Sequence, residues 1–161
     1  FLLYNLPMEK FSGFAPLYDN NSKILVLGSF PSVKSRQQGF YYGNKQNRFW
    51  KTLCKAFGVD TVQTVEEKRQ LCLSHGVALW DVVDSCTVKG SMDSDLRNVS
   101  LVDLSVFVGV PLKRILCIGQ TSYKLTMSCY KGSVPVVKMP STSPANVRFD
   151  EQVWLQQLKE E

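Results

Sequence analysis

The sequence predicts an α/β protein with a mostly parallel sheet covered by helices on both faces. Short apolar runs of strand type alternate with segments whose apolar residues recur at helical spacing. Strands that alternate with helices pair in parallel, and such sheets are covered on both faces. The 161 residues, 44% hydrophobic and 20% charged, have the size and composition of one globular domain.

The amino-terminal half predicts one strand and two helices. The strand is the apolar run 23–27, which contains β-branched residues and ends at a glycine. Segment 47–57 is predicted to be helical because its large apolar residues fall on one side at a spacing of 3.6. A second helix opens at the capping box 64–67 and runs toward Ser74, with Gly76 as its stop.

The carboxyl-terminal half predicts three further strands and two helices. The strands are expected over the apolar runs 77–83, 113–119 and 134–139. The helices are expected around 121–130 and over 149–159. The segment 84–98 is polar, and no element is predicted there.

The charges are segregated along the chain. The net charge is +5, and the segments 20–59 and 104–149 contain 13 of the 19 Lys and Arg residues and no Asp or Glu. Segregation of this kind indicates a positive face, for which binding of a polyanion is the commonest use. The alternative is a solvated surface with an incidental bias.

Composition also excludes several classes of protein. The five cysteines are odd in number, widely spaced and mostly within apolar segments, which favours reduced core thiols in a cytosolic protein. The chain has no Cys-x-x-Cys pair and a single histidine, His75, so we expect no metal site. No apolar run approaches the ~20 residues of a membrane span, and no signal peptide is visible.

Two predicted loops carry the residues suited to chemistry. The first begins with Gly28-Ser29-Phe30-Pro31-Ser32 at the carboxyl end of a strand, where open α/β sheets bind ligands. It then offers stacking rings, amides and cations, which suit a base and its phosphates. These residues are Tyr41, Tyr42, Asn44, Gln46, Asn47, Lys34, Arg36, Lys45 and Arg48.

The second loop, 140–146, follows the last predicted strand. Its sequence Pro140-Ser141-Thr142-Ser143-Pro144-Ala145-Asn146 supplies hydroxyl groups and backbone N–H groups for phosphate contacts. Two prolines stiffen it. Alone, such a segment also suits a plain connection between two elements.

Several motifs together resemble the hypoxanthine-DNA glycosylase branch of the uracil-DNA glycosylase superfamily. The similarity covers about residues 23–150 and rests on motifs in order: 28–32, 41–50, 79–82, 93–98 and 139–146. The resemblance implies a three-layer αβα sandwich around a four-stranded parallel sheet, and makes 1–161 a single glycosylase domain. It implies excision of deaminated bases from DNA (hypoxanthine, with uracil or xanthine as further substrates) without metal or cofactor.

The resemblance also assigns roles to residues. Relatives carry a catalytic Asp or Asn where this chain has Phe30, and the hypoxanthine-type branch looks as if it uses the later amide, here Asn47. The implied base-binding residues are Phe30, Tyr42 and Asp81, with Tyr42 at the stacking aromatic position. Met139 stands where many relatives have His or Asn. Asn44-Lys45 replaces a frequent His-Pro. The implied contacts with DNA are Ser32, Lys34, Lys45, Arg48, Ser141, Thr142, Ser143, Pro144 and Asn146.

Two roles for Asp81 remain open at this point. It stands where relatives carry a base-reading Asn, and its carboxylate could accept the lactam N–H of hypoxanthine or uracil. A full negative charge would oppose an anionic leaving group, so Asp81 could instead be a structural acceptor for backbone N–H groups.

The sequence thus predicts a monomeric, monofunctional glycosylase that acts on double-stranded or single-stranded DNA in a bacterial or archaeal cytosol, associated with the nucleoid through DNA and with no membrane partner. Two alternatives remain at this point. One is a nucleic-acid-binding module of the same fold without catalysis, and the other is an enzyme of free nucleosides or nucleotides.

Overall fold

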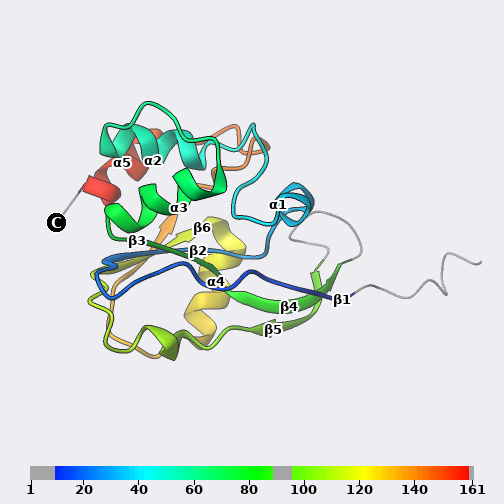
Figure 1. Ribbon diagram of the computed structural model, residues 1–161. Coiled ribbons are helices and arrows are strands. Elements are labelled where there is room, and N and C mark those ends of the chain that lie inside the picture. Colours follow the sequence, from blue (N-terminus) through cyan, green and yellow to red (C-terminus); the bar gives the residue numbers. More distant parts are fainter. Residues whose placement is uncertain (1–9, 89–95, 160–161) are drawn as a thin grey trace, which may run out of the picture.

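The computed structural model describes residues 10–88 and 96–159, and its centre is a four-stranded parallel sheet (Figure 1). Its strands, in the spatial order β3-β2-β6-β7, are β3 (Val77–Asp81), β2 (Ile24–Gly28), β6 (Arg114–Ile118) and β7 (Val136–Met139). All three strand pairings are parallel. The predicted α/β fold class is therefore confirmed.

Helices cover both faces of this sheet. Three lie on one face: α2 (Phe49–Phe57), α3 (Val65–Ser74) and α5 (Glu151–Lys159). The other face is covered by α4 (Gly119–Cys129) and the 3-10 turn η3 (Leu104–Phe107). This arrangement gives the three layers that the resemblance implied.

The central strand β2 shows why its sequence is a continuous apolar run. Ile24 and Val26 pack in the core beneath α2 and α5, whereas Leu25 and Leu27 pack on the opposite side, in the core that contains Phe107. Successive side chains of a strand point to opposite faces, so a strand covered on both faces must be apolar at every position.

A second, antiparallel sheet was not predicted. It consists of β1 (Lys10–Ser12), β4 (Val83–Val88) and β5 (Leu96–Leu101), in the order β1-β4-β5. The expected strand 77–83 divides at Val82, so β4 continues from the carboxyl end of β3 (Figure 1). β5 was missed because its four central residues are exposed and polar or mixed, and show no apolar run. Residues 93–95 of the motif 93–98 lie outside the described residues.

A short helix, α1 (Val33–Gln38), was also missed. Ser32 caps its first turn by accepting the N–H of Ser35 (3.2 Å), and Gly39 ends it in the left-handed conformation, with φ 75°. Ser and Gly are the usual residues at these two positions. The predicted capping box of α3 is confirmed, since Thr64 and Glu67 bond reciprocally.

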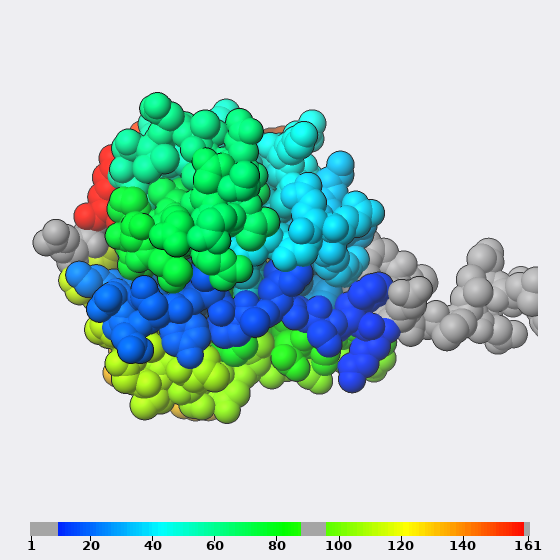
Figure 2. Space-filling model, in the orientation of Figure 1, coloured from blue at the N-terminus to red at the C-terminus, as the bar shows by residue number. Residues whose placement is uncertain are grey.

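The surface in Figure 2 follows from this layering. Residues 10–25 cross the face as a band, with α3 above and the segment around η3 below. None of the helices in 10–88 and 96–159 is long and apolar enough to cross a bilayer.

Candidate active site

The two loops predicted to carry the chemistry meet at the carboxyl edge of the parallel sheet. Gly28, the last residue of β2, pairs with Asp81, the last residue of β3. β7 ends at Met139 and leads into loop 140–146. The N–H of Arg48 donates to the carbonyl oxygen of Thr142 (3.0 Å), so the first loop contacts the second directly.

Gly28 is a point of close approach. A Cβ at this position would clash with Oδ1 of Asp81 and would lie 3.2 Å from the hydroxyl oxygen of Tyr42. Only glycine leaves this space. The Asp81 carboxylate and the Tyr42 hydroxyl therefore both lie against the backbone of Gly28.

Asp81 is buried, with 4% of its surface exposed. Its charge also acts on Tyr41: burial first, and the negative charge of Asp81 second, raise the pKa of the Tyr41 phenol. The Tyr41 hydroxyl donates to the carbonyl oxygen of Ala15 (2.8 Å). Asp81 thus presents a shielded carboxylate at the sheet edge, as both interpretations of this residue require.

Tyr42 has an unusual backbone and a buried hydroxyl. Its φ is 52°, in the left-handed region that non-glycine residues rarely adopt. Its ring packs against Phe49, with 4.1 Å between the ring centroids. Tyr42 therefore joins the aromatic cluster at the start of α2, while its hydroxyl lies at the sheet edge against Gly28.

Helix α1 holds the turn that contains Tyr42. The N–H of Gly43 donates to Oγ of Ser35 (2.9 Å), and Ser32 Oγ donates to the same oxygen (3.1 Å). Gly43 also packs closely on this helix, since a Cβ there would lie 2.7 Å from Oε1 of Gln38 and 3.2 Å from the Cα of Ser35. The strained conformation of Tyr42 is therefore fixed by contacts on its carboxyl-terminal side.

Asn47 lies one residue before Arg48, the N-cap residue of α2, which makes no side-chain cap bond itself. The Oδ1 of Asn47 accepts the backbone N–H of Phe49 (2.9 Å), and its own N–H donates to the carbonyl oxygen of Asn44 (2.9 Å). The bond to Phe49 fixes the amide plane and uses one lone pair of Oδ1. The second lone pair and the amide nitrogen take no further protein partner among the described residues.

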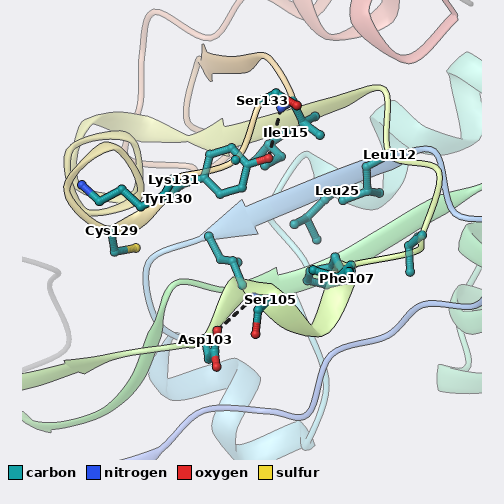
Figure 3. A pocket seen from close by; sticks show the side chains of 15 residues that line it. Leu25, Asp103, Ser105, Phe107, Leu112, Ile115, Cys129, Tyr130, Lys131 and Ser133 are labelled. Atoms are coloured by element: carbon teal, nitrogen blue, oxygen red, sulfur yellow. Dashed lines mark hydrogen bonds between the residues drawn. The ribbon is translucent and has the colours of Figure 1, made fainter.

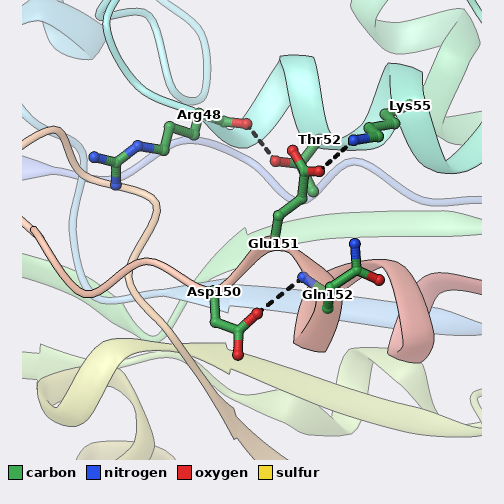
Figure 4. A network of polar contacts seen from close by, with 6 residues as sticks. All are labelled: Arg48, Thr52, Lys55, Asp150, Glu151 and Gln152. Carbon is green, nitrogen blue, oxygen red and sulfur yellow. Dashed lines mark hydrogen bonds and ion pairs between the residues drawn. The ribbon is translucent and has the colours of Figure 1, made fainter.

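Arg48 is bound to the second loop. Its Nη1 donates to the carbonyl oxygens of Ser143 (3.3 Å) and Asn146 (2.9 Å), and its guanidinium carbon lies 5.0 Å from the centre of the Phe149 ring. Figure 4 shows its carbonyl bonded to Thr52, beside the ion pair between Lys55 of α2 and Glu151 of α5. Arg48, predicted to contact DNA, here joins the two loops.

The remaining residues predicted from the resemblance are dispersed over both loops. Phe30 is buried in the core on the α4 side, apart from the cluster that contains Tyr42 and Phe49. Thr142 is 1% exposed, and its hydroxyl has no hydrogen-bond partner among the described residues. Ser32, Lys34, Lys45 and Pro144 are exposed, whereas Ser141, Ser143 and Asn146 are half-buried.

Backbone contacts organise the second loop internally. The Asn146 side chain donates to the carbonyl oxygen of Ser141 (2.9 Å), and Ser141 Oγ accepts the N–H of Ser143 (3.2 Å). Trp154 of α5 donates to the carbonyl oxygen of Pro140 (2.8 Å). The loop is therefore a defined structure that presents Pro144 and Ala145 outward.

A separate apolar cavity of about 450 Å³ lies on the α4 side of the sheet (Figure 3). Leu25, Phe107 and Ile115 line it together with the residues that follow α4. None of the residues predicted to bind or cleave DNA lines it. Within the described ranges, no group of three or more His, Cys, Asp or Glu residues could hold a metal ion.

Two contributors to the site were not predicted. Ser35 was overlooked because α1 was treated as part of a loop, although a Ser before the segment and a Gly after it marked both ends of a helix. The close approach at Gly28 depends on the pairing of β2 with β3. No local sequence pattern predicts this contact.

Comparisons with known proteins agree with this geometry. The model of the uracil DNA glycosylase superfamily matches residues 15–159. The chain is 35% identical over 144 residues to a hypoxanthine DNA glycosylase of Methanosarcina acetivorans, over 85% of this chain and 89% of the relative. It is 31% identical over 116 residues to a hypoxanthine DNA glycosylase of Methanosarcina barkeri, over 70% of this chain and 73% of the relative.

A solved structure is similar as well. A solution NMR structure of a candidate uracil DNA glycosylase from Methanosarcina acetivorans has a TM-score of 0.81 and 29% sequence identity to this chain. The match covers 94% of this chain and 98% of the other. The similarity thus includes the sheet and both loops at its carboxyl edge.

Proposed function

Because this chain belongs to the uracil-DNA glycosylase superfamily and is a DNA N-glycosylase, we propose that it excises hypoxanthine from DNA, with uracil and xanthine as further substrates. The reaction is monofunctional hydrolysis that leaves an abasic site, the first step of base excision repair. The observation that carries the proposal is the meeting of Gly28, Asp81 and Tyr42 at the sheet edge, since Tyr42 also lines one groove with Asn47. Two relatives that bear the name hypoxanthine DNA glycosylase support the choice of base.

The chemistry of the leaving group sets the demands on this site. Cleavage of an N-glycosidic bond forms an oxocarbenium-like sugar and an anionic base, so the enzyme must orient water and tolerate charge on the departing ring. Hypoxanthine, uracil and xanthine delocalise that charge onto lactam carbonyl groups. They suit a site whose water-holding group is a neutral amide.

We assign Asn47 to the attacking water. An amide is not a strong base at neutral pH, so Asn47 orients the water through the second lone pair of Oδ1. Its hydrogen bond from the N–H of Phe49 holds the amide in one plane, which limits the positions that the water can take.

We assign Tyr42 and Asp81 to the flipped base. Removing a base from the stack costs a few kcal/mol, and stacking on Tyr42 returns roughly 1–3 kcal/mol of it. The Asp81 carboxylate, which lies against Gly28, accepts the lactam N–H that distinguishes hypoxanthine from adenine.

The test is base release from labelled duplexes that contain a single deoxyinosine, deoxyuridine or deoxyxanthosine, followed by alkaline cleavage of the abasic product. We expect cleavage of the inosine duplex and none of the matched adenine duplex. Release of uracil alone would show that the choice of base is wrong. Release of no base from any duplex would contradict the assigned substrates altogether.

A further inference from the structure

A groove of about 1190 Å³ runs along the outer side of α2. Tyr42 and Asn47 line it before the helix begins, and the segment 59–63 lines it after the helix ends. Lys51, Cys54 and Lys55 of α2 also line it, and residues spaced in this way share one face of a helix. Nine helical residues extend about 13 Å, so the groove leads well away from the proposed catalytic residues.

Lysines dominate the charge of the groove. Lys45, Lys51 and Lys68 line it, whereas Asp60 is the one carboxylate in its lining. The ion pair found among the described residues joins Lys55 to Glu151, which leaves these three lysines without a protein carboxylate. Cations from a loop and from two helices thus face one channel, as is typical of a site for a polyanion.

The other lining groups suit exposed bases. Four amides, Gln38, Asn44, Gln46 and Gln63, each offer two N–H donors and a carbonyl acceptor. The half-buried ring of Tyr42 adds aromatic surface, whereas Trp50 is only 7% exposed and has Lys68 Nζ 5.4 Å from the centre of its ring. Cations, amides and rings in one groove are the combination that holds single-stranded nucleic acid.

We propose that this groove binds a single strand of DNA that continues from the target nucleotide, over about four nucleotides at the B-form rise of ~3.4 Å per residue. A single strand fits the lining better than a duplex, because only unpaired bases expose their faces and edges to the rings and amides of the groove. The proposal rests on the proposed function for the identity of the strand. It predicts a preference for targets next to an unpaired stretch.

The first experiment measures binding of an undamaged oligothymidylate to the full chain by fluorescence anisotropy. Lys51→Glu and Lys68→Glu should each weaken binding at least fivefold and reduce the salt slope by about 0.7 per lost phosphate contact. Lys124→Glu, an identical charge change on an exposed residue of α4 on the other face of the sheet, should change the affinity less than twofold. Thermal unfolding of the three variants checks that each is folded.

Binding of an undamaged, fully paired duplex separates the groove from a general positive surface. The proposal is overturned if Lys51→Glu weakens duplex binding as much as oligothymidylate binding. It is also overturned if Lys51→Glu and Lys124→Glu behave alike. These measurements involve no base release, so they remain decisive even if the assigned bases are wrong.

The second experiment compares the rate of base release from inosine in three substrates. In the first, inosine lies in a full duplex. In the other two, it lies next to a 5′ or a 3′ single-stranded stretch. Release should be at least threefold faster from one of the two partly unpaired substrates than from the full duplex. Lys51→Glu should abolish this difference and leave the rate on the full duplex unchanged. The side that benefits gives the direction of the strand in the groove. Equal rates for all three substrates would contradict the proposal.

Discussion

One oxygen atom of Asn47 serves two purposes. Oδ1 accepts the N–H of Phe49, the first residue of α2, and the proposed mechanism gives its second lone pair to the attacking water. Loss of such a hydrogen bond costs about 1 kcal/mol, whereas loss of a group that orients a reacting water costs at least two powers of ten in rate. The two contributions can therefore be separated by measuring stability and rate on the same variants.

We predict that Asn47→Ala lowers the rate of single-turnover excision at least ~100-fold, because no side chain then orients the attacking water. The affinity for duplex DNA should stay unchanged. Asn47→Ser retains an oxygen that can accept the N–H of Phe49 but is too short to hold the same water. Its melting temperature should stay near that of the wild type, while its excision rate falls as in Asn47→Ala. Normal excision by Asn47→Ser would mean that Asn47 acts only through its bond to Phe49.

Tyr42 offers a second test at this scale. Tyr42→Ala should slow excision of every substrate, because the flipped base loses its stacking surface, worth roughly 1–3 kcal/mol. Tyr42→Phe keeps the ring and its contact with Phe49, so we expect a rate within about threefold of the wild type. Single-turnover rates of both variants provide the comparison. If Phe is as damaging as Ala, the hydroxyl beside Gly28 is the essential group and the stacking role is wrong.

At the scale of elements, the parallel sheet was predictable and its surroundings were not. The strands β2, β3 and β6 are buried on both faces, so each is a continuous apolar run. β5 and α1 lack such a run because β5 is mostly exposed and α1 has only six residues. Arg48 shows the same limit within the site, since its bonds reach carbonyl groups 95 and 98 positions away along the chain.

The loops were placed correctly because chain order fixes them at strand ends, and parallel strands end at one edge. Arg48 was predicted to contact DNA because a cation beside an aromatic loop suits a phosphate, and no local signal shows that its partners are carbonyl groups. Its three hydrogen bonds to loop 140–146 indicate that it sets the distance between the two loops.

Arg48→Lys distinguishes these roles, because it keeps the charge and loses the forked donor geometry. If Arg48 joins the loops, Arg48→Lys should slow excision about tenfold, and Arg48→Met should leave the salt slope of duplex binding unchanged. Lys45→Met, on the same loop, should reduce that slope by about 0.9. A wild-type rate for Arg48→Lys together with a reduced slope for Arg48→Met would instead assign Arg48 to a phosphate.

At the scale of the whole molecule, the positive charge is distributed between two opposite edges of the sheet. Lys45 belongs to the first loop, and Lys138 lies one residue before the end of β7, where it bonds Gln120 at the start of α4 (2.6 Å). Lys23 and Lys113 directly precede β2 and β6, and a backbone hydrogen bond joins them at the amino edge (2.7 Å). Lys45 and Lys138 thus form a pair at the carboxyl edge of the sheet, and Lys23 and Lys113 form a pair at the amino edge.

We predict that the carboxyl-edge pair contacts DNA phosphates and the amino-edge pair does not. Lys45→Glu with Lys138→Glu should weaken duplex binding and lower the slope of log K against log salt, which is about 0.9 per phosphate contacted on B-DNA. Lys23→Glu with Lys113→Glu changes the net charge equally and should leave the slope at its wild-type value. All four lysines are exposed, so both double variants should fold. A salt titration of the wild type and the two variants is the measurement. Because the two double variants change the net charge equally, an equal loss in both would mean that DNA senses the charge of the whole protein and no particular edge.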